Sequence, residues 1–239
     1  MKLTSPSQSA KSAILSKLRG AKATVIEKEI LDYPVWQSHD SELLKQRFIA
    51  GLSASHAEVI CVRSSQIANA VEQVLTSKAC KSVIVGGACD ETAGVSEYEG
   101  GEFLTEILKG ASHLDIVQFG REFEVLKSSL FNEIDAGITH CLGGIADTGT
   151  LVLWPDKAEP RSLSLIPPCH IALIKRSTIV SNFAGMMIEQ SWQEKMPTHI
   201  VLISGPSKTA DIQQTLAYGA HGPSQLVVIL IDDVGVAQP

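Results

Sequence analysis

The segment SVIVGG, residues 82–87, decides how the fold of this chain is interpreted. It is a short apolar run that ends in two glycines, and such runs are typical of strands buried in a parallel sheet. Before it, apolar residues at 67, 70, 71, 74 and 75 follow the spacing of an amphipathic helix. A strand-like run over residues 58–62 precedes that helix. The order strand, helix, strand predicts an α/β protein with a largely parallel sheet.

The alternation continues on both sides of this unit. Leu44, Phe48 and Leu52 recur every four residues and predict a helix over residues 41–52. Further strands are expected at residues 115–119, 136–142, 149–154, 170–175, 199–204 and 226–232, with a helical stretch over 182–193. We therefore expect helices on both faces of the sheet. The segments 136–142 and 149–154 are joined by a short loop and are expected to form a local antiparallel pair.

The N-terminal part of the chain differs from the rest. Apolar residues at Ile14, Leu15 and Leu18 predict a helix after a frayed terminus, and residues 21–40 look extended. We therefore expect residues 1–40 to form an N-terminal helix and an extended arm. Residues 41–239 are expected to form a single α/β domain.

Composition limits the classes of function. The net charge of −6 argues against a nucleic-acid-binding protein, which would carry a clustered basic surface. The five cysteines show no CxxC spacing, which argues against a zinc site or an iron–sulfur cluster held by this chain alone. No apolar run approaches the roughly 20 residues that span a bilayer. We expect a cytoplasmic protein that handles small molecules or protein partners, without a metal or cofactor of its own.

The loop GGIADTGTLVL, residues 143–153, is the first candidate site. Gly144 and Gly149 allow positive φ or a close approach to a ligand, and Asp147 is the candidate catalytic acid or base. The hydroxyls of Thr148 and Thr150 stand beside it at a strand end, where open α/β sheets bind ligands. The alternative is a glycine-rich hairpin in which Asp147 only bonds its own backbone.

The segment EPRSLSLIPPCHIALI, residues 159–174, is the second candidate. Arg161 is able to clamp a carboxylate or phosphate through two parallel hydrogen bonds. Equally, it is suited to a surface salt bridge with Glu159. His170 begins the next strand, where a structural hydrogen-bonding role competes with a role in binding a ligand.

The segment ISGPSKTADIQQ, residues 203–214, is the third candidate. A helix is expected to start near Thr209, so that its free N–H groups face the corner formed by Ser204, Gly205 and Ser207. Lys208 adds a positive charge to this predicted anion site. Asp211 is an alternative partner for the helix end, and the spacing is not that of a nucleotide-binding P-loop.

A fourth candidate is the turn that contains His221 and Gly222, which leads into the last strand. A histidine on a glycine turn is poorly placed for a core, so a functional role and a structural role are equally open there. Asp90 and Glu91, which follow Gly86 and Gly87, form another strand-end loop that borders the expected site. We expect the loop of Asp147, Arg161 and Lys208 to converge at strand ends on one face of one sheet.

Three motifs carry a resemblance to a known family. IADTGTLVL (residues 145–153), RSLSLIPPCHIALI (161–174) and SGPSKTADIQQTLAYGAHGP (204–223) occur in this order, and together they closely resemble the lactate-utilization protein C family of bacteria. The match covers roughly residues 138–230, and the first half of the chain is similar only in pattern. Members of that family often have Glu at position 147 and Arg at position 208, so the geometry of the site here differs somewhat.

The resemblance implies a three-layer α/β/α sandwich, like that of the glucosamine-phosphate isomerase, ribose-phosphate isomerase and CoA-transferase group. It also implies a part in the oxidation of L-lactate to pyruvate. The chain looks like the component without a cluster, whose partners carry the iron–sulfur clusters, and its cleft is expected to bind a small anionic metabolite.

Two other functions stay open at this point. One is a free-standing enzyme that acts on a phosphorylated or CoA-linked small metabolite, by analogy with proteins of the implied fold. The other is a binding or regulatory module with no chemistry of its own. The sequence does not identify the ligand, establish whether the chain is itself catalytic, or give its oligomeric state.

Overall fold

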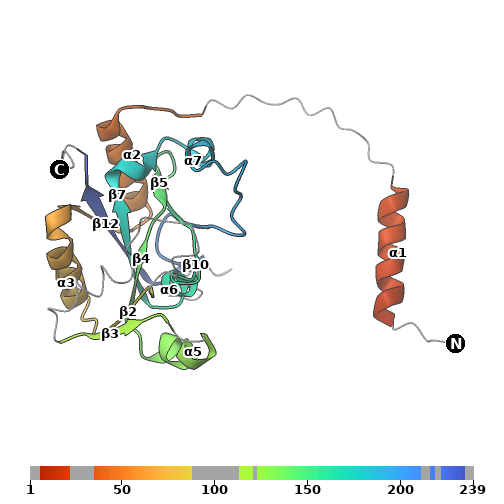
Figure 1. Cartoon of the computed structure of the whole chain (residues 1–239), viewed down its shortest axis with the longest axis horizontal. Helices are drawn as coiled ribbons and strands as arrows, with labels where there is room; N and C mark the ends of the chain where they lie inside the picture. The colour runs from red at the N-terminus through yellow and green to blue at the C-terminus, as the bar shows by residue number, and fades with distance from the viewer. Residues whose placement is uncertain are drawn as a thin grey trace. The chain divides into compact units, whose positions relative to one another are not determined.

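A six-stranded sheet forms the centre of the computed structural model (Figure 1). The structure describes residues 6–21, 35–87, 113–120, 123–210, 216–218 and 222–234. The strands, in their spatial order, are β1 (Glu58–Arg63), β12 (Gln225–Asp232), β7 (Cys169–Lys175), β4 (Ala136–His140), β2 (Ser82–Val85) and β3 (Asp115–Gln118). Every neighbouring pair is parallel, which confirms the predicted α/β fold with a largely parallel sheet. The carboxyl ends of all six strands therefore share one edge, called here the carboxyl edge.

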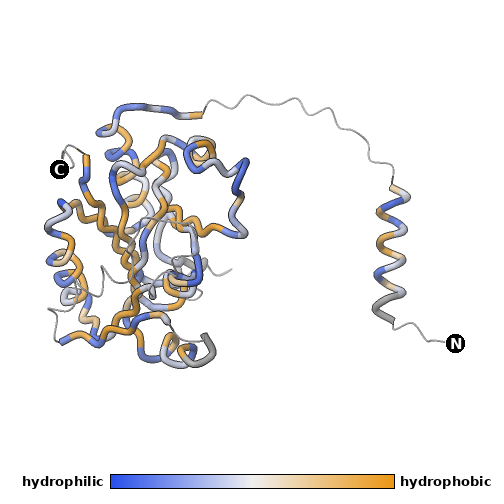
Figure 2. Tube along the Cα trace, in the orientation of Figure 1, coloured by the Kyte–Doolittle hydropathy of each residue, from blue (hydrophilic) through white to orange (hydrophobic). Residues whose placement is uncertain are grey.

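Helices and a second sheet cover both faces of the six-stranded sheet. On one face, α3 (Ile67–Ser77) packs on the side chains of Val83 and Val85. On the other face, Ile84 contacts the buried side chains of α5 (Phe123–Asn132) and α6 (Ser162–Leu165). This division follows from the alternation of side chains along a strand, and it gives the three layers that were expected. Hydrophobic residues concentrate along the central strands (Figure 2).

A four-stranded sheet lies on the α6 side of the molecule, in the order β8 (Ile179–Val180), β5 (Gly143–Ile145), β6 (Thr150–Leu153) and β9 (Val201–Ile203). Its β5 and β6 form an antiparallel hairpin. The expected pairing of segments 136–142 and 149–154 is therefore wrong, because β4 joins the central sheet and the intervening glycines form the partner strand. The strand expected at 199–204 likewise belongs to this smaller sheet.

The helix α2 (Ser41–Ala54) packs between the two sheets. Its Phe48 is fully buried, and a Cβ placed on Gly144 would come within 2.7 Å of the Phe48 ring. Gly149 has a φ of +58°, and a Cβ there would lie 2.5 Å from the carbonyl carbon of Gly51. The sequence needs glycine at these two positions so that the small sheet can approach α2.

The helix expected near Thr209 is wrong. Residues Lys208–Ala210 form β10, which pairs antiparallel with β11 (Leu216–Tyr218). Pairing with β11 gives this backbone its hydrogen bonds, so tertiary structure overrides the local helix signal. The corner at Ser204 therefore leads into a strand, and no helix of the described residues begins at it.

Other elements complete the chain. The short helices η1 (Ser64–Gln66) and η3 (Arg176–Thr178) follow β1 and β7, and α7 (Phe183–Glu189) begins after Asn182, whose side chain accepts a hydrogen bond from the Gly185 amide. The chain divides into two units, Met1–Pro34 and Val35–Pro239. The first contains α1 (Pro6–Gly20), a helix with Lys17 and Arg19 in its last turn.

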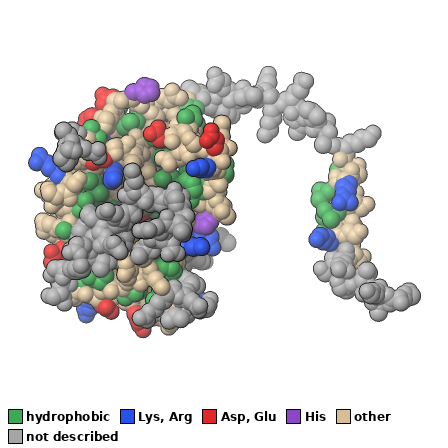
Figure 3. Space-filling view, viewed as in Figure 1, with side chains coloured by type: hydrophobic (Ala, Val, Ile, Leu, Met, Phe, Trp, Pro, Cys, Tyr) green, Lys and Arg blue, Asp and Glu red, His purple; other side chains and the backbone are tan. Residues whose placement is uncertain are grey.

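The described helices are all too short or too polar to cross a membrane. On the face shown in Figure 3, acidic and basic side chains are interspersed rather than gathered into one charged patch.

Candidate functional site

A cavity of about 240 Å³ lies between α6, the start of β7 and the end of β9, and is called here the large cavity. Its polar lining comes from the hydroxyls of Ser164, Ser204 and Ser207 and from the ring of His170. Gly205 and Gly222 also line it, and an apolar wall contains Leu165, Val201, Ile203 and Leu226. The described lining holds no Lys, Arg, Asp or Glu side chain. Such a cavity fits a small molecule with one apolar side and several hydrogen-bonding groups.

His170 and Ser164 are buried polar residues in the lining of the large cavity. The His170 side chain is 1% exposed, and its Nε2 lies 2.8 Å from the hydroxyl of Thr139, which is also buried. Its Nδ1 is one of three buried side-chain nitrogen or oxygen atoms without a hydrogen-bond partner among the described residues. Burial lowers the pKa of His170 to about 3, so the ring is neutral at physiological pH. A buried nitrogen without a partner is costly, and a hydrogen-bonding group brought within reach of Nδ1 would relieve that cost.

Gly137 lies beside His170 in the central sheet, and its lack of a side chain leaves room for α6. A Cβ at Gly137 would lie 2.1 Å from the backbone oxygen of Leu163 in α6. Because α6 approaches the sheet this closely, Ser164 reaches the large cavity from one side while Thr139 holds His170 from the other.

A second, smaller cavity adjoins the first at Ser164 and is called here the small cavity. Its lining includes Thr139, His140, Glu159, Arg161 and Ser164, and its volume is about 10 Å³. One Glu159 carboxylate oxygen accepts from the backbone N–H of His140 at 2.6 Å, and the other lies 3.0 Å from His140 Nδ1. Both side chains are mostly buried, with 13% and 19% exposed. Ser164 lines both cavities, and the contact between Thr139 and His170 joins the two linings, so the two cavities together are called here the cleft.

Arg161 stands exposed at the rim of the small cavity. The structure pairs Glu159 with His140, and among the described residues Arg161 has no ion-pair partner. The alternative of a salt bridge between Arg161 and Glu159 is therefore not what the structure contains. A guanidinium without a carboxylate partner is available to a ligand anion.

Asp147 lies at the turn between β5 and β6 and lines neither cavity. Its carboxylate oxygen is 2.6 Å from the Arg47 guanidinium of α2, which also stacks over the Trp36 ring at 4.4 Å. Beside it, the hydroxyls of Thr148, Thr150 and Ser204 form a chain with 2.7 Å between neighbours. The Asp147 carboxylate is thus held by a partner that the sequence did not reveal, and its catalytic role stays a prediction.

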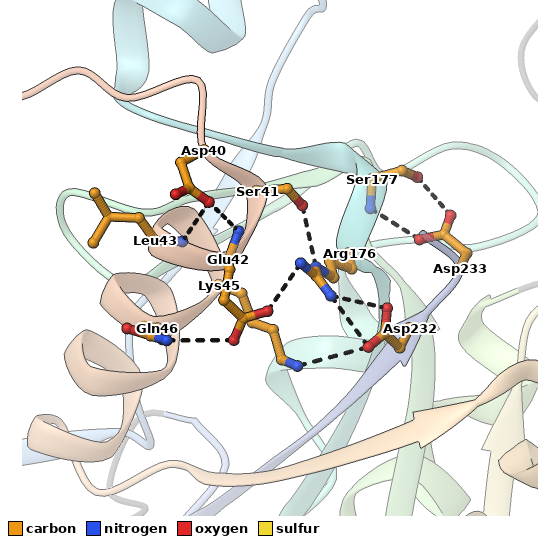
Figure 4. Close-up of polar contacts among 10 residues, drawn as sticks. All are labelled: Asp40, Ser41, Glu42, Leu43, Lys45, Gln46, Arg176, Ser177, Asp232 and Asp233. Atoms are coloured by element: carbon orange, nitrogen blue, oxygen red, sulfur yellow. Dashed lines mark hydrogen bonds and ion pairs between the residues drawn. The ribbon is translucent and has the colours of Figure 1, made fainter. Parts of the chain in front are cut away.

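The carboxyl edge carries another charged cluster at β7 and β12, called here the Arg176 network (Figure 4). Arg176 donates to both carboxylate oxygens of Asp232 at 3.2 Å, contacts Glu42 at 3.0 Å and donates to the Ser41 hydroxyl at 3.1 Å. Lys45 lies 3.6 Å from Asp232. Burial alone would raise the pKa of Asp232, but attraction to Arg176, its hydrogen bonds and Lys45 together lower it. These charges are mutually satisfied, so the network ties α2 to the ends of two strands.

The predicted site residues thus separate into three groups. His170, Ser204, Gly205, Ser207 and Gly222 line the large cavity, and Arg161 lines the small one. Gly144, Thr148, Gly149 and Thr150 stay with Asp147 beside α2, and a Cβ at Gly205 would also meet the C-terminal cap of α2, Ser55, at 2.6 Å. The side chains of Lys208 and Thr209 and the whole of His221, Asp90, Glu91 and Asp211 lie outside the described residues. The expected convergence of the Asp147 loop, Arg161 and Lys208 stays a prediction, since Asp147 lies at the turn between β5 and β6, Arg161 lines the small cavity, and the side chain of Lys208 lies outside the described residues.

His140, Glu159 and Thr139 were missed as site residues. His140 follows a run of buried strand residues directly, and a histidine at the end of a parallel strand was the signal that could have identified it. In the part of the chain that is described, no group of three or more His, Cys, Asp or Glu side chains is placed to hold a metal ion. Cys61, Cys80, Cys141 and Cys169 are free thiols.

The chain is similar to known proteins over most of its length. Residues 45–231 match the family model of the LUD domain. An uncharacterized protein of Neisseria meningitidis serogroup B is 36% identical over 93% of this chain and 94% of its own length. Lactate utilization protein C of Shouchella clausii is 34% identical over 75% of each chain. A crystal structure of a DUF162 family protein from Deinococcus radiodurans shares the fold with a TM-score of 0.54, at 22% identity, over 81% of this chain and 99% of that one.

Proposed function

The chain belongs to the LUD domain family, and we propose that it is a component of a bacterial system that oxidises L-lactate to pyruvate. In this proposal it is a cytoplasmic subunit without a cluster of its own. Its partners are the iron–sulfur proteins of the system. The cleft formed by the large and small cavities binds a small anionic metabolite of the pathway.

Relatives named lactate utilization protein C support the role in lactate use. The relative from Shouchella clausii matches three quarters of the chain, and one from Macrococcus caseolyticus is 36% identical over 55% of it. The first of these matches extends well beyond a single motif, which favours a shared role over a shared local structure.

The observation that carries the ligand proposal is that His170, whose buried Nδ1 has no hydrogen-bond partner among the described residues, lines a cavity of about 240 Å³. That volume is below the roughly 300–1,000 Å³ of pockets that hold drug-sized ligands. The cavity therefore suits a metabolite of a few carbon atoms. It is small for a CoA thioester, which weakens the alternative of a free-standing enzyme acting on such compounds.

Deletion of the gene tests the role in lactate use. We expect the deletion strain to grow on glucose and to lose growth on L-lactate, and the intact gene to restore it. Purification of the chain from its native host under reducing conditions should recover cysteine-rich iron–sulfur proteins with it. Normal growth of the deletion strain on L-lactate as the sole carbon source would contradict the proposal.

The cleft is tested separately with the purified protein. L-lactate or pyruvate should raise the thermal unfolding temperature, and His170→Gln should reduce that shift. Gln keeps a nitrogen near the position of His Nε2, so the contact with Thr139 is retained while Nδ1 is lost. The matched control is His56→Asn, which changes an exposed histidine with a φ of +68° to a residue that tolerates such a φ. An equal shift in His170→Gln and wild type would remove His170 from the binding site.

A further inference from the structure

Positive charge is concentrated in the first 26 residues of the chain. Five of the 20 basic residues lie there, and none of the 26 acidic residues does. The rest of the chain therefore has 15 basic and 26 acidic residues, a net charge of −11. A partner with negative charge is attracted by the first part of the chain and repelled by the second. The charge distribution thus indicates where an anionic partner would bind.

The charged side chains of α1 are all basic. This helix of 15 residues contains Lys11, Lys17 and Arg19 and no Asp or Glu. Pairs of Glu and Lys four residues apart, which stabilise many exposed helices, are therefore impossible within it. Lys17 and Arg19 are favourable near the negative end of the helix dipole, but Lys11 lies too far from that end to contribute. A basic amphipathic helix is typical of a segment that binds a membrane surface or an acidic groove.

Three large apolar side chains lie together on one side of α1. Ile14 and Leu18 are four residues apart and Leu15 follows Ile14, so the three share one face. They are 59%, 38% and 66% exposed in the order Ile14, Leu15 and Leu18. Within the unit Met1–Pro34, α1 is the one helix or strand that the described residues form. Because an isolated helix of this length is marginal in water, an apolar partner surface would stabilise it.

Basic side chains flank this apolar face. With about 100° per residue, Lys17 lies about 60° to one side of Ile14 and Arg19 about 40° beyond Leu15 on the other side. Lys11 lies one turn before the apolar face. Figure 3 shows hydrophobic side chains on the helix with basic side chains beside them. The far side carries three small polar residues, Ser9, Ser12 and Ser16. Long basic side chains in this position can reach lipid phosphates while their stems cover the apolar face.

The shortness of the apolar face favours a lipid surface over a protein groove. Helices that bind in a groove use anchors at positions i, i+3 or i+4, and i+7, which span two turns. The large apolar side chains of α1 occupy residues 14–18, about one turn. A bilayer surface needs no second turn of anchors, because its phosphates are available to every basic side chain around the helix.

We propose that α1 binds the surface of an anionic lipid bilayer. Ile14, Leu15 and Leu18 insert among the headgroups, and the basic side chains bind lipid phosphates. The helix lies in the plane of the membrane, since 15 residues are fewer than the roughly 17–25 that cross a bilayer. The acidic remainder of the chain is repelled by the same surface, so the contact is confined to the N-terminal part. This inference goes beyond the proposed function and does not rest on it.

Sedimentation of the full chain with lipid vesicles tests this inference. One set of vesicles contains equal parts of phosphatidylglycerol and phosphatidylcholine, and the other contains phosphatidylcholine alone. We expect binding to be at least about tenfold stronger to the anionic vesicles, since each basic residue near such a surface contributes about fivefold. Raising sodium chloride from about 0.1 M to about 1 M should weaken that binding by about tenfold or more, because salt screens exposed charges.

Three variants on α1 separate the apolar and the basic contributions. Leu18→Gln keeps a good helix former but loses a large apolar side chain, and should weaken binding by about tenfold or more. Lys17→Gln removes one charge and should weaken it by about fivefold. Ser16→Gln is the matched control, because it introduces the same residue on the far side of the same helix. It should bind as the wild type does.

Each outcome supports or overturns the role of α1. Equal binding to both kinds of vesicle, or binding that Leu18→Gln and Ser16→Gln change equally, overturns it. A wild-type chain that stays in the supernatant with both vesicles overturns it too. If that chain instead self-associates in sedimentation velocity and Leu18→Gln abolishes the association, the apolar face belongs to a protein contact. The growth and ligand-binding experiments are independent of all these results.

Discussion

Two charged clusters lie at the carboxyl edge of the central sheet, and they differ in whether each charged side chain has an ion-pair partner. At β7 and β12, Arg176 has Asp232, Glu42 and Ser41 as partners. At β2 and β4, Glu159 is committed to His140, while Arg161 has no ion-pair partner among the described residues. The first cluster joins α2 to the sheet, and the second lines the small cavity. A charge at the carboxyl edge is therefore not a ligand site by its position alone.

The largest expected difference between the clusters is in stability. Arg176→Ala leaves Asp232 and Glu42 without their shared partner in a place where the arginine is only 12% exposed. We expect the free energy of unfolding to fall by about 2–3 kcal/mol, at the lower end for a broken buried pair because Asp232 and Glu42 are partly solvated. Arg161→Ala should change it by less than about 0.5 kcal/mol, as exposed substitutions do. Urea unfolding of both variants measures the two values.

Equal losses in the two variants would break the comparison. They would show that Arg161 also stabilises the fold, so that its exposure would no longer indicate a role in binding a ligand. Binding of L-lactate provides the complementary measurement, since Arg176→Ala should keep the wild-type affinity wherever the protein is folded.

The next effect concerns His170 and pH. Its pKa in the folded state is about 3, below the usual value near 6.5, so the unfolded chain takes up a proton that the folded chain refuses. Stability is therefore fully present above about pH 6.5 and falls as the pH drops towards 3. Between pH 6.5 and pH 5 this group alone should remove about 1.5 kcal/mol of stability.

His170→Gln cannot titrate and should show a flatter loss over that range. Unfolding in urea at pH 6.5 and pH 5 gives the difference, with His56→Asn expected to follow the wild type. The same slope in His170→Gln and in the wild type would mean that the ring is protonated inside the fold, and the neutral character of the large cavity would be wrong.

The smallest effect is expected at Asp147. Its ion pair with Arg47 joins two side chains that are 30% and 43% exposed, so a double-mutant cycle with Asp147→Asn and Arg47→Gln should give a coupling of about 0.2–1 kcal/mol. The affinity for L-lactate should stay within about twofold of wild type in Asp147→Asn, because Asp147 lines neither cavity. A tenfold loss of affinity would return Asp147 to the binding site.

The fold was predictable from local pattern to a large extent. The run 82–87 and the strands at 170–175 and 226–232 are apolar throughout because both faces of the central sheet are covered, and this gave the parallel sheet. The small sheet could not be predicted from the sequence, because the glycines of β5 are typical of a loop. They are glycines because α2 approaches them, and that contact joins segments about 100 residues apart. The helix expected at Thr209 failed because pairing with β11 overrides the local signal.

The site was predictable only in part. Arg161, His170 and Ser204 were singled out by residue type at strand ends and corners, and the structure places them in one cleft or at its rim. His140 and Glu159 are 19 residues apart and their pairing depends on how the loop before α6 crosses the ends of β2 and β4. The glycine-rich loop points to Asp147 as a site residue, but its partner Arg47 comes from a helix 100 residues earlier. Sequence pattern identifies such groups singly and does not give their pairing.

The most direct measurement is the set of histidine ring and arginine Nε resonances in a ¹⁵N-labelled sample titrated with L-lactate. We predict that the signals of His140 and Arg161 shift with a common dissociation constant, while the signal of Arg176 stays in place. Shifts at Arg176 without shifts at His140 and Arg161 would contradict this prediction, because the ligand would then occupy the half of the carboxyl edge whose charges are already paired.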